Sequence, residues 1–206
     1  KEALRINPDF IEVRSSLGIA YAKQGKIDEG IEECKTALRI NPNHACAHNN
    51  LGNIYNDLGK LDEAIREYQQ AIRVNPNYAT AHSNLGNAYQ GQGRFDDAVR
   101  ECKEALRIKP NYSDAHNNLG NAYQTQRKID EAIIEYKEAL RINPNHANAH
   151  NNLGTAYDTQ GNLDAAILEY KEALRIDPDH FKAHYNLGTA YNSQGNFEAV
   201  MLEYKE

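Results

Sequence analysis

The sequence predicts an all-α solenoid of antiparallel helix-turn-helix repeats with a period of 34 residues. Proline returns at this interval, at Pro8, Pro42, Pro76, Pro110, Pro144 and Pro178. A Leu-Gly pair keeps the same interval, beginning at Leu17, Leu51, Leu85, Leu119, Leu153 and Leu187. A fixed period of this kind is typical of chains in which each unit buries its apolar face only against its neighbours.

The 34-residue period predicts that the 206 residues form one continuous array of repeats. We expect residues 1–10 to end a preceding repeat and residues 181–206 to form part of a following one. The full repeats then span 11–44, 45–78, 79–112, 113–146 and 147–180. Because both ends fall within a repeat, we expect a piece of a longer array. Its incomplete ends should expose apolar surface, and copies are expected to stack head to tail through them.

Two helices are expected in each repeat, as residues 45–78 illustrate. Apolar residues recur at helical spacing before Gly59 and again after it. Gly59 is predicted to end the first helix in a left-handed conformation, and Asp62 to cap the second helix. Pro76 ends the second helix, because the residue before a proline is disfavoured in the α region. Each repeat is therefore predicted to be an antiparallel hairpin.

Two positions break ordinary helix preferences. Gly52 and its counterparts lie inside the first helix, where glycine costs roughly 0.5–1 kcal/mol relative to alanine. We therefore expect another helix to approach closely there. Arg127 stands where the other repeats have the glycine between helices, so it is predicted to hold an unfavourable left-handed conformation.

The charge and the distribution of apolar residues exclude some classes of binding partner. The formal net charge of −6 argues against nucleic acid or an anionic membrane as partner, and no apolar run approaches transmembrane length. Cys34 and Cys102 stand where other repeats have tyrosine, so we expect them to fill the core without pairing. Unpaired cysteines indicate a reducing, cytoplasmic location.

Several motifs carry a family resemblance. Asn-Leu-Gly-Asn-x-Tyr, Gly-x-x-Asp-Glu-Ala-Ile, Tyr-x-x-Ala-Leu and Asn-Pro-Asn together resemble the tetratricopeptide repeat over essentially the whole chain. The resemblance implies a right-handed superhelix whose first helices line a concave groove that holds peptides or partner proteins. One departure is a polar residue where the family has a large aromatic, namely Arg14, His48, His82, His116, His150 and His184.

Asparagines gather on one face of the first helices. They precede Leu-Gly at Asn50, Asn84, Asn118, Asn152 and Asn186, lie one residue earlier at Asn49, Asn117 and Asn151, and follow Leu-Gly at Asn53, Asn87 and Asn121. Asparagine is a mediocre helix former, so its repeated use here indicates a functional surface. A carboxamide can bond a peptide unit through both its N–H and its C=O.

Two interpretations of this face remain open. In the first, the amides bind the backbone of an extended peptide. The asparagines before Leu-Gly resemble those of the protein O-linked N-acetylglucosamine transferase repeats, which implies the same role. In the second, the amides bond adjacent helices and keep the surface polar. The predicted function is a protein-interaction scaffold, and the alternative is the substrate-recognition arm of a larger enzyme such as a glycosyltransferase.

No catalytic residue, cofactor or metal site is predicted. Near-identical repeats offer no unique position for a nucleophile and its base. His44 and His48 have the i,i+4 spacing that can chelate a metal. Tyr78 and Tyr112 replace the first of these histidines in other repeats, so ring packing is the preferred interpretation. A Lys and Arg clamp for a peptide carboxylate is not expected, because the corresponding positions hold mainly Asn, Ser and Thr.

Overall fold

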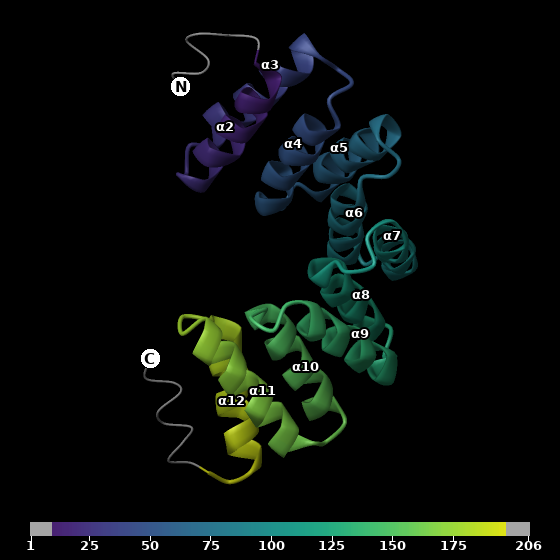
Figure 1. Ribbon diagram of the computed structural model, residues 1–206. Coiled ribbons are helices and arrows are strands. Elements are labelled where there is room, and N and C mark those ends of the chain that lie inside the picture. The colour runs from purple at the N-terminus through teal and green to yellow at the C-terminus, as the bar shows by residue number, and fades with distance from the viewer. Residues whose placement is uncertain (1–9, 197–206) are drawn as a thin grey trace. The chain divides into compact units, whose positions relative to one another are not determined.

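The computed structural model describes residues 10–196, which form eleven α-helices and no strand (Figure 1). The fold divides into two compact units at the connection between Lys109 and Pro110. The first unit contains α2 (Ile11–Lys23), α3 (Ile27–Ile40), α4 (Ala45–Asp57), α5 (Leu61–Val74), α6 (Ala79–Gly91) and α7 (Phe95–Ile108). The second contains α8 (Ser113–Thr125), α9 (Ile129–Ile142), α10 (Ala147–Thr159), α11 (Leu163–Ile176) and α12 (Phe181–Ser193).

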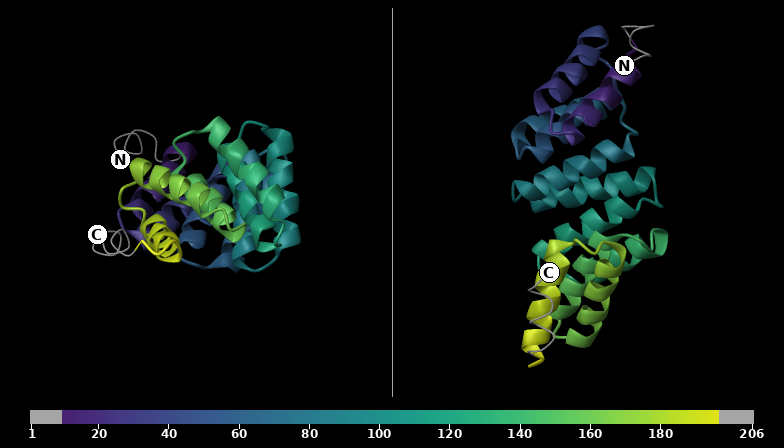
Figure 2. Two further views of the ribbon diagram at one scale, coloured as in Figure 1. Left: turned by 90° about the horizontal axis from the view of Figure 1, so that it is seen from below. Right: turned by 90° about the vertical axis from the view of Figure 1, so that its left-hand side faces the viewer.

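Consecutive helices pair as hairpins, and each hairpin packs on the next one in its unit. In the first unit the pairs are α2 with α3, α4 with α5 and α6 with α7. In the second unit α8 pairs with α9 and α10 with α11. Figure 2 shows the two helices of a hairpin side by side in both views. The predicted all-α solenoid of helical hairpins is therefore confirmed.

The turn within each hairpin depends on one residue with a positive φ angle. Gly59 has φ +69°, and Gly25, Gly93, Gly161 and Gly195 have similar values. Arg127 adopts φ 61°, which confirms the conformation predicted for it. Among the described residues it is the sole non-glycine residue with a positive φ. A side chain in this region brings Cβ too close to the following carbonyl oxygen.

Close approach of the two helices explains the glycine in the Leu-Gly pair. A Cβ atom added to Gly52 would lie 2.6 Å from the ring of Tyr68, which is only 2% exposed. In the first repeat the partner is Cys34, whose Sγ would lie 2.5 Å from a Cβ on Gly18. Burial raises the pKa of the Cys34 thiol to about 12, so the thiol stays neutral. Cys34 and Cys102 are buried and unpaired, as expected for core residues.

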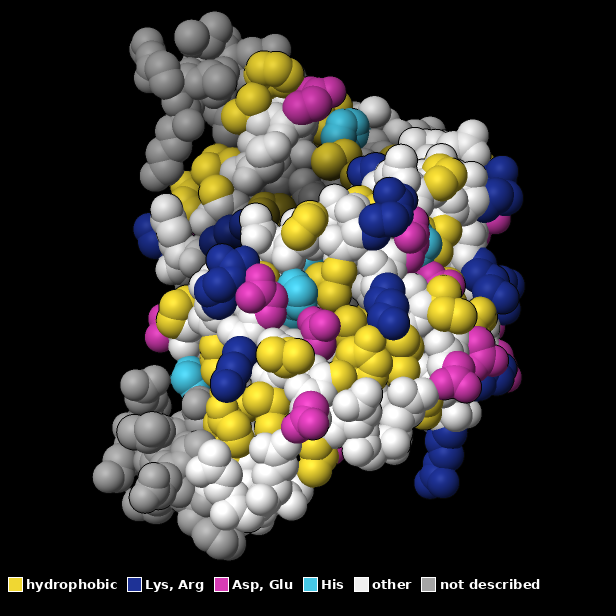
Figure 3. All heavy atoms as spheres, turned by 60° about the horizontal axis from the view of Figure 1, so that its bottom comes forward, with side chains coloured by type: hydrophobic (Ala, Val, Ile, Leu, Met, Phe, Trp, Pro, Cys, Tyr) yellow, Lys and Arg dark blue, Asp and Glu magenta, His cyan; other side chains and the backbone are white. Residues whose placement is uncertain are grey.

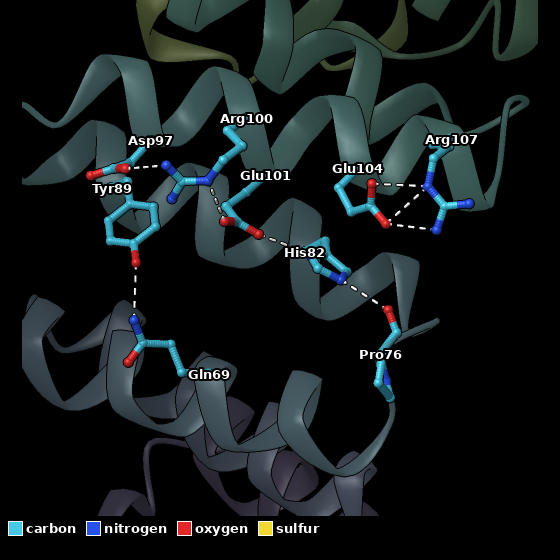
Figure 4. Close-up of polar contacts among 9 residues, drawn as sticks. All are labelled: Gln69, Pro76, His82, Tyr89, Asp97, Arg100, Glu101, Glu104 and Arg107. Carbon is cyan, nitrogen blue, oxygen red and sulfur yellow. Dashed lines mark hydrogen bonds and ion pairs between the residues drawn. The ribbon is translucent and has the colours of Figure 1, made fainter.

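The histidines in place of the family's aromatic residue join three chain segments. Nδ1 of His82 lies 2.8 Å from Oε2 of Glu101 on α7, and Nε2 lies 3.1 Å from the carbonyl oxygen of Pro76 (Figure 4). The same pair of contacts recurs at His48, His116 and His150. This position therefore ties both helices of a hairpin to the connection that precedes them.

The prediction that Asp62 caps α5 is wrong. The N-cap position belongs to Lys60, whose side chain makes no capping hydrogen bond. Asp62 instead accepts a 2.5 Å hydrogen bond from the side chain of Gln92, in the turn of the following hairpin. Gln160 bonds Asp130 in the same way. The aspartate therefore joins neighbouring repeats, which the local sequence pattern does not reveal.

Candidate functional site

The predicted asparagines lie at three positions of the first helix of each hairpin, and the position two residues before Leu-Gly is buried. Asn49, Asn117 and Asn151 are 3%, 7% and 4% exposed. A buried amide requires hydrogen-bond partners, because leaving it unpaired costs free energy. These three side chains face the neighbouring repeat.

Their partners are the asparagines immediately before Leu-Gly. Nδ2 of Asn84 donates to Oδ1 of Asn49 and to Oδ1 of Asn53, each over 3.0 Å. In the second unit, Nδ2 of Asn152 donates to Asn117 over 2.9 Å, and Nδ2 of Asn186 donates to Asn151 over 2.9 Å. These amides therefore connect one repeat to the next within each unit.

This arrangement leaves the amide oxygens of Asn84 and Asn186 available to a ligand. Both hydrogens of the Asn84 nitrogen are donated within the protein, while its Oδ1 bonds no residue in the range 10–196. Asn186 has the same pattern, because its nitrogen also contacts the Thr155 hydroxyl at 3.4 Å. The expectation that each amide engages a peptide unit through both groups therefore does not fit these residues. They can accept hydrogen bonds from a ligand but have no donor left.

The third position, one residue after Leu-Gly, bonds a tyrosine of the paired helix. The Tyr68 hydroxyl donates to Oδ1 of Asn53 over 2.9 Å, and the Tyr136 hydroxyl donates to Asn121 over 2.8 Å. A buried hydroxyl requires such an acceptor. The asparagines at this position in these two repeats therefore have a structural role.

Asn87 is different. Its hairpin has Cys102 in place of the tyrosine, so no hydroxyl reaches it. The Asn87 side chain is exposed and makes no hydrogen bond with any residue that the structure describes. Its carboxamide can both donate and accept. Asparagine is a mediocre helix former, and Asn87 has no partner among the described residues, so it is a candidate for contact with a ligand.

A pocket of about 440 Å³ lies in the first unit, beside these amides. Asn53, Asn84 and Asn87 line it together with aliphatic residues from the first two hairpins. The first unit therefore brings together three predicted site residues around one concave surface.

The paired histidines have a role that sequence reasoning missed. Nδ1 of His44 accepts a hydrogen bond from the backbone N–H of Ala47 over 3.1 Å, so His44 caps α4. His146 and His180 cap α10 and α12 in the same way. Within residues 10–196, no group of three or more His, Cys, Asp or Glu side chains is arranged to hold a metal ion.

Charges are mixed on the surface in view in Figure 3, where acidic, basic and hydrophobic side chains lie interspersed. Many of the charges are paired locally, as in Arg107 with Glu104 over 2.7 Å (Figure 4). No helix in the described part of the chain is long and apolar enough to cross a membrane.

Sequence models of the tetratricopeptide repeat match five sets of residues, namely 11–44, 52–93, 77–145, 117–181, and 33–66 with 169–199. Together these matches extend without a gap from residue 11 to residue 199. The chain belongs to the tetratricopeptide repeat family. Its helical hairpins, glycine turns and 34-residue period are the features of that family seen in this structure.

Solved tetratricopeptide structures share the fold. A thermophilic repeat protein of Thermus thermophilus aligns with a TM-score of 0.76 at 24% identity, covering 87% of this chain and 98% of its own. The APC/C hetero-tetramer Cut9–Hcn1 aligns with a TM-score of 0.92 at 19% identity, covering 98% of this chain and 40% of its own. YrrB, a TPR protein with an unusual peptide-binding site, aligns with a TM-score of 0.62 at 21% identity, covering 89% and 95%. No curated protein matches the chain in sequence.

Proposed function

We propose that the chain is a protein-interaction scaffold that binds an extended peptide in polar, asparagine-lined grooves of its repeats. The exposed, unpartnered carboxamide of Asn87 is the observation that carries this proposal. The free Oδ1 atoms of Asn84 and Asn186 support it, because they can accept hydrogen bonds from the N–H groups of a peptide backbone. Asn49, Asn117 and Asn151 are buried, so we assign them to joining repeats rather than to contacting the ligand.

Backbone recognition has a definite geometry. Packed helices lie about 8–10 Å apart, and an extended chain advances about 3.3 Å per residue. Two free oxygens on neighbouring hairpins would therefore meet a peptide at positions about three residues apart. Such a surface recognises the main chain and tolerates many side chains, as a scaffold requires.

A backbone N-methyl scan tests this proposal directly. A peptide is first selected from a random library against the whole chain, and its N–H groups are then methylated one at a time. We expect weaker binding at positions about three residues apart, measured by fluorescence anisotropy, because each methyl group removes one donor. Uniform tolerance of methylation would overturn the proposal.

Asn87→Ala provides the matching change in the protein. We expect peptide binding to weaken by about twofold to tenfold, the equivalent of a net hydrogen bond of roughly 0.5–1.5 kcal/mol. Thermal stability should be equal or slightly higher, because alanine is the better helix former. Arg66→Ala, an exposed change on α5, is the control and should leave binding intact. Normal binding by Asn87→Ala would contradict the proposal.

Three finer expectations remain proposals. We infer a non-catalytic role for this chain and a cytoplasmic location, the latter supported by its unpaired cysteines. Head-to-tail stacking of copies depends on residues 1–9 and 197–206, which lie outside the described residues. Light scattering over a concentration series tests it, and a strictly monomeric chain at millimolar concentration would contradict it.

A further inference from the structure

One side of the pocket in the first unit is apolar. Ile19, Ala22 and Ile27 line it, and all three are partly buried against a core cluster that includes Ile54. Asn84 and Asn87 line the same pocket. The pocket therefore places aliphatic surface beside free amide groups.

This apolar side replaces polar residues found in another repeat. In the hairpin of α8 and α9, Asn121 and Gln124 occupy the positions of Ile19 and Ala22, and the Tyr136 hydroxyl oxygen lies 2.8 Å from the Asn121 side-chain oxygen and 2.7 Å from that of Gln124, within hydrogen-bonding distance of both. Cys34 stands at the tyrosine position in the first hairpin, where it has no hydroxyl to satisfy. The first hairpin therefore combines the loss of the tyrosine hydroxyl with aliphatic residues at these positions, whereas the hairpin with Cys102 keeps Asn87 and Gln90 there.

Two opposite charges also line this pocket. Lys23 ends α2 and Asp57 ends α4, at equivalent positions of adjacent repeats. Both side chains are exposed, and neither forms an ion pair or hydrogen bond with a described residue. In the other repeats this position is uncharged, with Gly91, Thr125, Thr159 and Ser193. The charge pair is therefore particular to the pocket.

We propose that this pocket selects one segment of the ligand, an aliphatic side chain flanked by an acidic and a basic residue. The aliphatic side chain packs against Ile19, the carboxylate faces Lys23 and the cation faces Asp57. At about 3.3 Å per residue, a spacing of roughly 10 Å between adjacent helices separates the two ligand charges by about three residues. The inference rests on the proposed function, because the amides hold the backbone of the same peptide.

Two synthetic peptides form the probe, Glu-Leu-Ala-Lys and Lys-Leu-Ala-Glu, each flanked by glycines and labelled with fluorescein. One order should bind the whole chain more tightly, because the two charges distinguish the ends of the site. Replacing the leucine by asparagine should weaken the preferred peptide about tenfold or more, as expected for losing a buried aliphatic side chain. Equal binding of the leucine and asparagine peptides would overturn the inference, as would failure of both orders to bind.

Variants of the protein test which residues cause the preferences for peptide order and for leucine. The double exchange of Lys23→Asp with Asp57→Lys changes two exposed side chains and should reverse the preferred peptide order. Ile19→Asn, or Ile19→Ala if helicity falls, should reduce the discrimination between leucine and asparagine peptides. Thr189→Asn introduces the same residue at the equivalent position of α12, outside the pocket, and should preserve this discrimination.

Different results would overturn the selective pocket and the general scaffold proposal. Unchanged peptide order in the charge-exchange variant overturns the selective pocket. If Asn87→Ala and backbone methylation still weaken binding in that case, the general scaffold proposal stands. If Asn87→Ala and methylation are also without effect, both proposals fail. Circular dichroism of every variant confirms that helix content matches that of the unchanged chain.

Discussion

Nδ1 of His82 lies 2.8 Å from Oε2 of Glu101, while Nε2 of the same ring lies 3.1 Å from the carbonyl oxygen of Pro76. Both ring nitrogens face an acceptor, and only the protonated ring can donate to both, so these contacts favour the imidazolium form. Burial lowers the pKa of His82, but the hydrogen bonds to Glu101 and Pro76 and the charges of Glu101 and Glu104 outweigh it. The net result is a raised pKa.

The first prediction is that stability falls as pH rises above about 6.5, the ordinary pKa of histidine. The pKa values of His48, His82, His116 and His150 are all raised above 6.5 in the folded state. Their contribution is fully present below about 6.5 and is lost as pH rises through the higher folded pKa. Thermal melts between pH 6 and pH 9 should show a falling midpoint. Glu101→Gln should reduce this slope, and an unchanged slope would contradict the imidazolium assignment.

Gly120→Ala should destabilise the second unit. The added Cβ would lie 2.6 Å from the ring of Tyr136, which is fully buried and cannot move aside. Overpacking of this kind costs typically 1–3 kcal/mol. Urea denaturation measures the loss, and Thr125→Ala, an exposed change on the same helix, should cost much less. Equal stability of the two variants would mean that the helices separate at low cost.

Arg127→Gly should stabilise the turn between α8 and α9. A left-handed conformation costs a residue with a Cβ about 1–2 kcal/mol in the folded state. Against this gain, the greater freedom of glycine stabilises the unfolded chain by about 0.4–1 kcal/mol. The net gain measured by chemical denaturation is therefore expected to reach up to about 1.5 kcal/mol. The reverse change, Gly161→Arg at the equivalent turn, should destabilise by a similar amount. A loss of stability in Arg127→Gly would be inconsistent with strain at this φ angle.

Asn84→Ala should lower the free energy of unfolding, whereas Asn87→Ala should not. Removing the Asn84 amide leaves the buried oxygen of Asn49 without its donor, which costs about 1–3 kcal/mol. Asn87 has no described partner, so its replacement should cost nothing. Differential scanning calorimetry of both variants measures the difference. Equal midpoints would show that the contact between Asn84 and Asn49 contributes no net stability.

The repeat, the two helices of each hairpin and the turn residues can all be predicted from the amino-acid sequence. These features depend on local backbone preference and on apolar spacing, both of which are visible in one stretch of chain. The left-handed turn at Arg127 and the close approach at Gly52 follow from the same local rules, and both are confirmed.

The role of each polar side chain, in contrast, depends on how the repeats pack. Asn49 and Asn87 are both asparagines on first helices, yet one is buried between repeats and the other is exposed. Asn84 meets Asn49 across 35 residues, and Asp62 meets Gln92 across 30. The same carboxamide or carboxylate can form hydrogen bonds with several different kinds of partner. The partner that another repeat brings to it selects one role, and that partner depends on packing rather than on neighbouring sequence.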